Sequence, residues 1–471
     1  MEENVKNALI QIVGNENYTD ALIDRVSYSS DASEHHHRPD AAIWPQNTGQ
    51  VCQILELANK LHFPVVPRGA GTGLAGGAVP EKGGVVLDMC RMNKILQINI
   101  EDRQVVVQPG VVYADLQAAL DPYGFFFPPD PASGKAATLG GNVATNAGGL
   151  KGAKYGTTRD YVLALEVVLP DGSILRTGSN CMKSVSGYDL TRLFVGSEGT
   201  LGVITEITLK INPKPLAAST CTALFDAIDQ AGRAISEVMH SGIIPSALEM
   251  LDMECLSALR NNSDLDLPDA AAMVLAEADG YTQKDTDFQI TKVMEIFERN
   301  KAREIKRAKS RTEAERLWAA RKSIGGVLYR LGHNLLAEDV TVPISKVPEM
   351  LMRIEDIKRR HKVLIATLGH LGDGNLHPNV IFNGEDPAER DRAMHAVEDL
   401  FQLAIELGGT LTGEHGIGLA KAPFMELEHN SVAMDLMRKM KKLLDPNDIL
   451  NPGKMNLSVQ EETRTTRFTK S

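Results

Sequence analysis

Apolar positions along the first 210 residues alternate between the spacing of helices and the spacing of strands. Val51, Ile54, Leu55, Ala58 and Leu61 recur every three or four residues, as on one face of an amphipathic helix. Short apolar runs predict strands at 63–67, 85–88, 105–108, 162–169 and 203–210. This mixture predicts an α+β unit, and we end it at residues 212–215 (NPKP), because two prolines cannot continue a strand ladder.

A second pattern begins after residue 217. It predicts a strand at 221–225, a helix at 227–240, strands at 246–251 and 271–278, and then another helix. This order is typical of a ferredoxin-like βαββαβ unit. After about Gly418 the chain is predicted to return to the first unit. The predicted domains are therefore 1–217, 218–412 and 413–471, with a disordered tail at 460–471 because that tail is polar and lacks apolar periodicity.

Composition narrows the class of protein. A chain of 471 residues exceeds the size of one hydrophobic core, and 43% hydrophobic with 24% charged residues is typical of globular proteins. The net charge of −11 argues against nucleic acid as a partner. With no basic signal segment and no apolar run of about 18 residues, we expect a cytoplasmic protein without a transmembrane segment. The five cysteines form no close pair, which argues against an iron–sulfur cluster or a structural zinc.

Two glycine-rich segments are the strongest chemical signal, at 67–77 (PRGAGTGLAGG) and 128–149 (PPDPASGKAATLGGNVATNAGG). Small residues let backbone N–H groups approach a large anion such as a diphosphate. One such segment is more often an ordinary turn, but the two in this order are far more specific. The motifs KYGTTRD at 154–160 and VGSEGTLGVI at 195–204 accompany them.

Together these motifs resemble the FAD-binding domain of the vanillyl-alcohol oxidase superfamily, of the p-cresol methylhydroxylase (PCMH) type, in its D-2-hydroxyacid dehydrogenase branch. The resemblance implies a two-part PCMH-type FAD-binding domain with a ferredoxin-like α+β cap. It implies pyrophosphate binding by the first loop, flavin-ring contacts from the second, and adenine contacts from 202–204. The implied FAD-binding residues are Pro67, Arg68, Gly69, Ala70, Gly71, Thr72, Gly73, Gly76, Pro131, Ala132, Ser133, Thr138, Gly141, Asn142, Thr145, Asn146, Gly148, Gly156, Glu198, Gly202, Val203, Ile204 and Asn451.

Histidines near these loops bear on how FAD is attached. Some relatives bind FAD covalently through a histidine in the first loop, but residues 68–72 (RGAGT) contain none, so we predict noncovalent FAD. His35, His36 and His37 lie upstream, and three adjacent imidazoles cannot all face one metal. We interpret that triplet as a polar loop.

The segment 370–377 (HLGDGNLH) predicts a metal site without the resemblance. Apolar runs on both sides predict strands at 365–370 and 377–382, and Asp373-Gly374 is a preferred two-residue type I′ turn. That turn pairs His370 directly with His377 on one sheet face, about 5 Å apart at Cβ, where both can bind one divalent ion. Two histidines in a hairpin are nevertheless more often structural.

Residues 409–418 (GTLTGEHGIG) place Glu414 beside His415 in a glycine-rich turn. The resemblance implies that Glu414 completes a metal site with His370 and His377, that His415 is the catalytic base, and that Arg321 in WAARK binds the substrate carboxylate. The alternatives are a salt-bridge role for Glu414, a core imidazole at His415 and a solvated helix arginine at Arg321. Lys322 is a weaker candidate because neighbouring helix positions point about 100° apart.

The predicted reaction is oxidation of a D-2-hydroxyacid, with D-lactate to pyruvate favoured, by hydride transfer to flavin N5 with a divalent metal (Fe²⁺, Zn²⁺ or Mn²⁺). The alternatives are a D-2-hydroxyglutarate or glycolate dehydrogenase subunit, a redox-neutral enzyme like alkyl-dihydroxyacetone-phosphate synthase, and a flavin-binding scaffold. No GxGxxG follows a predicted strand, so a nicotinamide site is not expected in this chain. The resemblance implies an electron-transferring flavoprotein as the acceptor, ahead of an iron–sulfur subunit or quinones, because the sequence has no membrane segment and no clustered cysteines. A homodimer or larger complex is also expected.

Overall fold

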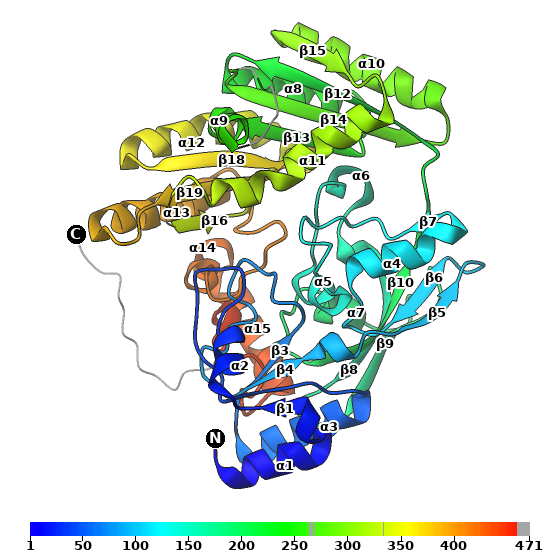
Figure 1. Cartoon of the computed structure of the whole chain (residues 1–471), viewed down its shortest axis with the longest axis vertical. Helices are drawn as coiled ribbons and strands as arrows, with labels where there is room; N and C mark the ends of the chain where they lie inside the picture. The colour runs from blue at the N-terminus through cyan, green and yellow to red at the C-terminus, as the bar shows by residue number, and fades with distance from the viewer. Residues whose placement is uncertain (263–266, 268, 333, 459–471) are drawn as a thin grey trace.

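The computed structural model describes residues 1–262, 267, 269–332 and 334–458 and has a mixed α+β fold in two parts (Figure 1). A large sheet with its helices, coloured green to yellow, occupies the upper part of the view, and blue, cyan and red segments form the lower part. The predicted disordered tail at 460–471 lies outside the described residues. None of the helices within these residues is long and apolar enough to span a bilayer.

Two sheets form the lower part. The first has the order β1 (Tyr18–Thr19), β2 (Ala41–Ile43), β4 (Val85–Asp88), β3 (Val65–Arg68), and all neighbours except β1 and β2 are parallel. The second is antiparallel, in the order β5 (Ile95–Asn99), β6 (Gln104–Val107), β10 (Val203–Lys210), β8 (Val162–Val168), β9 (Ile174–Gly178). The helices are α1 (Glu3–Val13), α2 (Leu22–Ser27), α3 (Thr48–Leu61), α4 (Tyr113–Leu120), α5 (Leu139–Thr145), α6 (Gly152–Tyr155) and α7 (Leu190–Phe194).

The apolar pattern predicted this part well. Each predicted strand is present, and α3 buries four of the five residues expected on its apolar face. Leu61 is exposed because it is the last residue of α3. The prediction that residues 212–215 end the strand pairing was wrong by one short strand, since β11 (Asn212–Pro213) pairs with β7 (Phe125–Phe126). A two-residue edge pairing tolerates a proline because it needs few N–H donors.

The upper sheet has the order β15 (Glu304–Arg307), β12 (Ala217–Phe225), β14 (Ala272–Gly280), β13 (Ala247–Asp252), β18 (Leu364–His370), β19 (Asn375–Phe382), β16 (Asn334–Ala337), and β17 (Val340–Thr341) also pairs with β19. The first four strands, with α8 (Ile228–His240), α9 (Met253–Asn262) and α10 (Gln283–Arg299), form the predicted ferredoxin-like unit. A second half, which sequence analysis missed, has the same strand order in β16, β18 and β19, with α12 (Val347–His361) and α13 (Pro387–Glu406).

The two faces of this sheet differ in what covers them. Helices α8, α10, α12 and α13 contribute to one large apolar core with residues of the strands, including Met250 of β13 and Ile365 of β18. Helices α9 and α11 (Arg311–Leu328) pack in a separate core with Leu251 and Leu368, which point to the opposite face because strand side chains alternate. The candidate site lies on this second face.

The C-terminal segment returns to the lower part, as Figure 1 shows for its orange and red ribbon. It contains α14 (Met425–Glu428) and α15 (Ser431–Leu444). Beyond α15, the backbone N–H of Val65 in β3 donates to the carbonyl of Ile449 at 2.7 Å, and Asn451 donates back to Val65 at 2.9 Å. These bonds extend the parallel sheet by a short bridge at its β3 edge.

Candidate active site

The β18–β19 hairpin carries both predicted histidine ligands, but its register differs from the prediction. His370 pairs with Asn375, and His377 pairs with Leu368, so the loop is four residues long (371–374). The predicted direct pairing of His370 with His377 was therefore wrong. A shift by an even number of positions keeps both side chains on one face, because strand side chains alternate with a period of two. The two imidazoles are diagonal neighbours, with ring centroids 5.0 Å apart.

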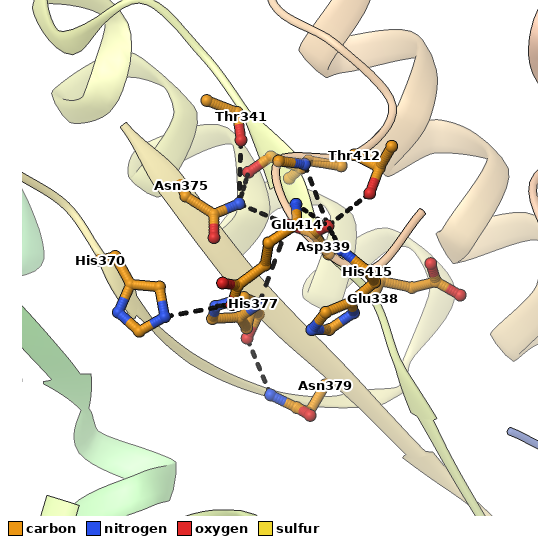
Figure 2. Close-up of polar contacts among 12 residues, drawn as sticks. Glu338, Asp339, Thr341, His370, Asn375, His377, Asn379, Thr412, Glu414 and His415 are labelled. Atoms are coloured by element: carbon orange, nitrogen blue, oxygen red, sulfur yellow. Dashed lines mark hydrogen bonds and ion pairs between the residues drawn. The ribbon is translucent and has the colours of Figure 1, made fainter. Parts of the chain in front are cut away.

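Glu414 joins these histidines from the loop that precedes α14. Its Oε1 lies 3.2 Å from Nε2 of His370 and 3.3 Å from Nε2 of His377. One ligand atom from each of the three residues falls within 4.8 Å of the others, and the three side chains converge in Figure 2. A tetrahedral ion with ligands at ~2.1 Å places those ligand atoms roughly 3.4 Å apart. The cluster therefore has the spacing and donor set of a two-histidine, one-carboxylate divalent metal site.

Electrostatics around Glu414 also fit a cation. Burial alone would raise the pKa of Glu414, but the charge of His370 and hydrogen bonds from both histidines hold it well below its ordinary value. Within the described part of the chain, its ion-pair partners are these two histidines, with no lysine or arginine.

His370 is held on its other side by Glu249 of β13, which sequence analysis missed. Glu249 Oε1 lies 2.6 Å from Nδ1 of His370, and Oε2 accepts a hydrogen bond from Nε of Arg321 at 2.8 Å and forms an ion pair with its Nη2 at 2.7 Å. Burial opposes ionisation of Glu249, but the charges of His370 and Arg321 lower its pKa. A glutamate inside the apolar strand ALEMLD was the available signal, because an acidic residue is almost never fully buried without a partner.

Asp339, between β16 and β17, supports the Glu414 loop and was also missed. Its Oδ2 accepts the backbone N–H groups of Gly413 (3.0 Å), Glu414 (2.9 Å) and His415 (2.8 Å), and the Thr412 hydroxyl at 2.6 Å. Figure 2 shows these bonds converging on one carboxylate. Burial would raise the pKa of Asp339, but the nearby cation of Lys421 and the hydrogen bond from the His415 backbone N–H help to hold it well below its ordinary value. The loop that presents Glu414 and His415 is thus anchored from the upper sheet.

His415 stacks on His377, with ring centroids 5.1 Å apart and an interplanar angle of 15°. Its Nδ1 is buried and has no hydrogen-bond partner among the residues described. Burial and the neighbouring His377 lower the pKa of His415 to about 4, against the opposing effect of Asp339. A neutral imidazole at this position has a nitrogen lone pair available to accept a proton.

A cleft of about 1460 Å³, counted to its open mouth, lies between the two glycine-rich loops and reaches this cluster. Both Glu414 and His415 line it. So do the predicted residues Pro67, Arg68, Gly69, Ala70, Gly71, Thr72, Gly73, Pro131, Ala132, Ser133, Thr138, Gly141, Asn142, Thr145, Glu198, Gly202, Val203 and Ile204.

Five predicted cofactor residues, Gly76, Asn146, Gly148, Gly156 and Asn451, do not line the cleft. Asn146 instead accepts from the Arg159 N–H at 2.8 Å, and Asn451 donates to the carbonyls of Gly77 and Glu198. A Cβ on Gly148 would lie 2.9 Å from Oε2 of Glu414, so a glycine there lets Glu414 approach.

The lining fits a flavin dinucleotide in two further respects. Asn142 is buried, and its Nδ2 has no partner among the residues described, so it can donate to a ligand. Pairing of β10 with β6 starts at Ile207, which leaves the Val203–Ile204 edge facing the cleft with backbone groups available. Glu198, by contrast, uses both oxygens on the backbone N–H groups of Ile417 and Gly418, each at 2.7 Å.

The structure also places the other residues that the sequence singled out, Arg321, Lys322 and the triplet His35–His37. Arg321 is buried on α11 and engaged with Glu249, so it is not a solvated helix arginine. Lys322 is exposed, and its Nζ lies 3.0 Å from Oδ2 of Asp130. Among the described residues, His370, His377 and Glu414 form a group of three possible metal ligands, and the His35–His37 triplet does not.

Sequence comparison assigns both parts of the chain. Residues 39–178 match the family model described as FAD binding domain, and residues 214–455 match FAD linked oxidases, C-terminal domain. Glycolate oxidase subunit GlcD of Bacillus subtilis is 44% identical over 456 residues, covering 96% of this chain and 97% of that protein. D-lactate dehydrogenase of Anaerostipes hadrus is 36% identical over 429 residues, covering 89% and 90%.

Solved structures with a similar fold are consistent with the FAD-binding family models. Substrate-bound p-cresol methylhydroxylase superposes with a TM-score of 0.81 at 18% identity, covering 97% of this chain and 98% of that one. This likeness confirms the predicted PCMH-type fold, while the substrate of that enzyme says nothing about this chain. The matched models, the extent of the identity and the cleft together show that the chain belongs to the family of FAD-linked oxidoreductases that includes the glycolate oxidase subunit and D-lactate dehydrogenase.

Proposed function

We propose that this chain oxidises a D-2-hydroxyacid, with D-lactate to pyruvate as the favoured reaction, using noncovalent FAD and one divalent metal ion. One observation carries the proposal: Glu414 and His415 line the same cleft as the two glycine-rich loops, and Glu414 meets His370 and His377 at metal-ligand spacing. A metal-bound hydroxyacid would therefore lie against the flavin-binding walls. The first loop has no histidine that could attach FAD covalently.

When bound, FAD supplies the hydride acceptor and the metal supplies a Lewis acid that makes the substrate hydroxyl more acidic. His370, His377 and Glu414 would hold the metal. His415, stacked beside His377, accepts the hydroxyl proton on its imidazole. In this proposal the adjacent residues Glu414 and His415 have different roles, the first as a metal ligand and the second as the base.

Arg321 is the proposed partner of the substrate carboxylate. Glu249 engages its Nε and Nη2, and its Nη1 has no hydrogen-bond partner among the residues described. A guanidinium with one edge fixed and one nitrogen unused can orient a second carboxylate. Lys322 is a weaker choice because it is exposed and pairs with Asp130.

The test is anaerobic titration of the purified, flavin-loaded protein with D-lactate, L-lactate, glycolate and D-2-hydroxyglutarate, followed by flavin absorbance. D-Lactate should bleach the oxidised band fastest, and His415→Asn should slow bleaching by roughly 100- to 10,000-fold while FAD stays bound. His240→Asn, at an exposed position on α8, is the matched control and should bleach at the wild-type rate. A flavin band that none of the four acids bleaches would refute the proposed activity.

Glycolate is the second candidate substrate, favoured by the 44% identical relative whose name is glycolate oxidase subunit. That name also supports a multi-subunit assembly for this chain. For the electron acceptor we propose an electron-transferring flavoprotein, and the cytoplasm stays the predicted location. Direct reduction of quinone by the pure chain, with no reduction of an added electron-transferring flavoprotein, would refute that acceptor.

A further inference from the structure

Glu249 is fully buried in the middle of the upper sheet, at a position where an apolar residue would be expected. It lies on the face of β13 that carries Leu251, and it is paired in register with His370 of β18. Burying a carboxylate is unfavourable unless its charge and its lone pairs are satisfied. The contacts of its two oxygens show what this carboxylate does.

The two oxygens of Glu249 have different partners. Nε and Nη2 of Arg321 both converge on Oε2, at 2.8 and 2.7 Å. Arginine usually pairs with a carboxylate through two parallel bonds, one to each oxygen. Here Oε1 is left for Nδ1 of His370, at 2.6 Å. The ion pair with Arg321 alone does not explain why one oxygen of Glu249 contacts Arg321 and the other contacts His370.

We propose that Glu249 is a positioning residue for the metal site, acting through His370. The proposal rests on the function proposed above. When His370 binds a metal through Nε2, the nitrogen that faces Glu414, its proton is on Nδ1, and Oε1 of Glu249 is placed to accept that proton in a hydrogen bond. Arg321 fixes the orientation of the Glu249 carboxylate through its contacts with Oε2. Glu249 thereby selects the tautomer and the ring direction that a metal requires.

The second histidine lacks such support. Nδ1 of His377 is buried without a hydrogen-bond partner among the residues described, and the Asp339 oxygen paired with it lies 4.0 Å away. Its ring is instead stacked on His415. His370 is thus the ligand whose direction is fixed before a metal arrives, and loss of Glu249 should weaken metal binding through His370.

The test compares Glu249→Gln with wild type by Zn²⁺ titration against a competing chelator, using the full flavin-loaded chain. The side-chain NH₂ of a glutamine must face either Arg321 or His370. In either orientation, a hydrogen-bond donor of glutamine then faces a hydrogen-bond donor of its neighbour, and that contact becomes unfavourable. We expect Zn²⁺ to bind roughly 10- to 100-fold more weakly, and the absorption bands of bound Co²⁺ to shift. Asp279→Asn is the matched control: this buried carboxylate of β14 pairs with Lys154, away from the histidines, so Zn²⁺ affinity should be unchanged.

Zn²⁺ affinity within about threefold of wild type in Glu249→Gln, with an unchanged Co²⁺ spectrum, would overturn the positioning role. If Glu249→Gln does not fold, the proposal can be tested on wild-type protein with nitrogen-15-labelled histidines and bound Zn²⁺. NMR then shows which ring nitrogen of His370 carries the proton. The His370 signal is identified as the one that is missing from the spectrum of His370→Gln. A proton on Nδ1 supports the proposal, and a proton on Nε2 overturns it. Wild type that binds neither metal would refute the metal-dependent function itself, and the positioning role with it.

Discussion

Replacing Asp339 by Asn should loosen the loop that carries Glu414 and His415. Oδ2 of Asp339 accepts the Thr412 hydroxyl and three successive backbone N–H groups, and Oδ1 accepts from Asn375. An asparagine can keep its one carbonyl oxygen on the loop only by turning its NH₂ towards the Asn375 amide. The substitution therefore removes the charge from four hydrogen bonds and makes the fifth contact repulsive.

The size of the effect follows from these five contacts. A hydrogen bond to a charged group contributes roughly 1.5–3 kcal/mol and a neutral one roughly 0.5–1.5, so each of the four bonds loses about 1 kcal/mol. Loss of the fifth contact adds about 1 kcal/mol, and relief from burying a charge offsets part of the sum. We expect the free energy of unfolding to fall by about 3 kcal/mol. For a unit the size of the upper part, that corresponds to a melting temperature about 6–12 °C lower.

Thermal unfolding followed by circular dichroism measures this change, and Zn²⁺ titration of the same samples reports on Glu414. Thr412→Val, which removes one of the four donors to Oδ2, should lower the melting temperature by about a third as much. Asp339→Asn with a melting temperature within about 2 °C of wild type and full Zn²⁺ affinity would refute the anchoring role.

Three further predictions concern the lower part. Gly149→Ala should reduce FAD occupancy, measured from the flavin-to-protein absorbance ratio, because residue 149 has φ +129° and a Cβ there would overlap the carbonyl oxygen of Asp130. Lys441→Met should lower the free energy of unfolding by about 3–5 kcal/mol in denaturant titrations, because it leaves buried Asp445 without its cation. Burial lowers the pKa of Lys454 from 10.5 to about 8, so the folded state binds fewer protons than the unfolded state between those values. Stability relative to Lys454→Met should therefore rise from pH 8 to 10.5, and a flat difference in melting temperature would contradict this sign.

The hairpin shows how far local sequence reasoning reaches. Strands around 365–370 and 377–382 followed from apolar runs, and the shared face of His370 and His377 followed from alternation. The turn was wrong because a four-residue loop replaces the two-residue turn expected for Asp373-Gly374. Gly374, at φ +84°, packs against the carbonyl of Val342 in a distant segment, a contact that local turn preferences do not contain. The predicted proximity of His370 and His377 was still correct, because the strand register differs from the prediction by two residues and an even shift leaves both side chains on the same face.

Glu249 and Asp339 could not be found in the same way. Each acts on a residue far away in the sequence, Glu249 on His370 and Asp339 on residues 412–415, through pairings that only the folded sheet brings together. A buried acidic residue in an apolar strand indicates that a partner exists, but its sequence does not identify the partner. The second βαββα half was missed for the same reason, since its strands pair with elements that are distant along the chain.

The segment 412–418 joins the two parts of the molecule. Asp339, from the upper sheet, binds its first half through the N–H groups of residues 413–415, and Glu198, from the lower part, binds the N–H groups of Ile417 and Gly418. Glu414 and His415 lie between these two carboxylates, where the metal cluster meets the cleft. Displacing either part would pull one anchor from the segment and move both side chains. The geometry of the site therefore depends on how the two parts pack together, which explains why no single stretch of sequence contains all of it.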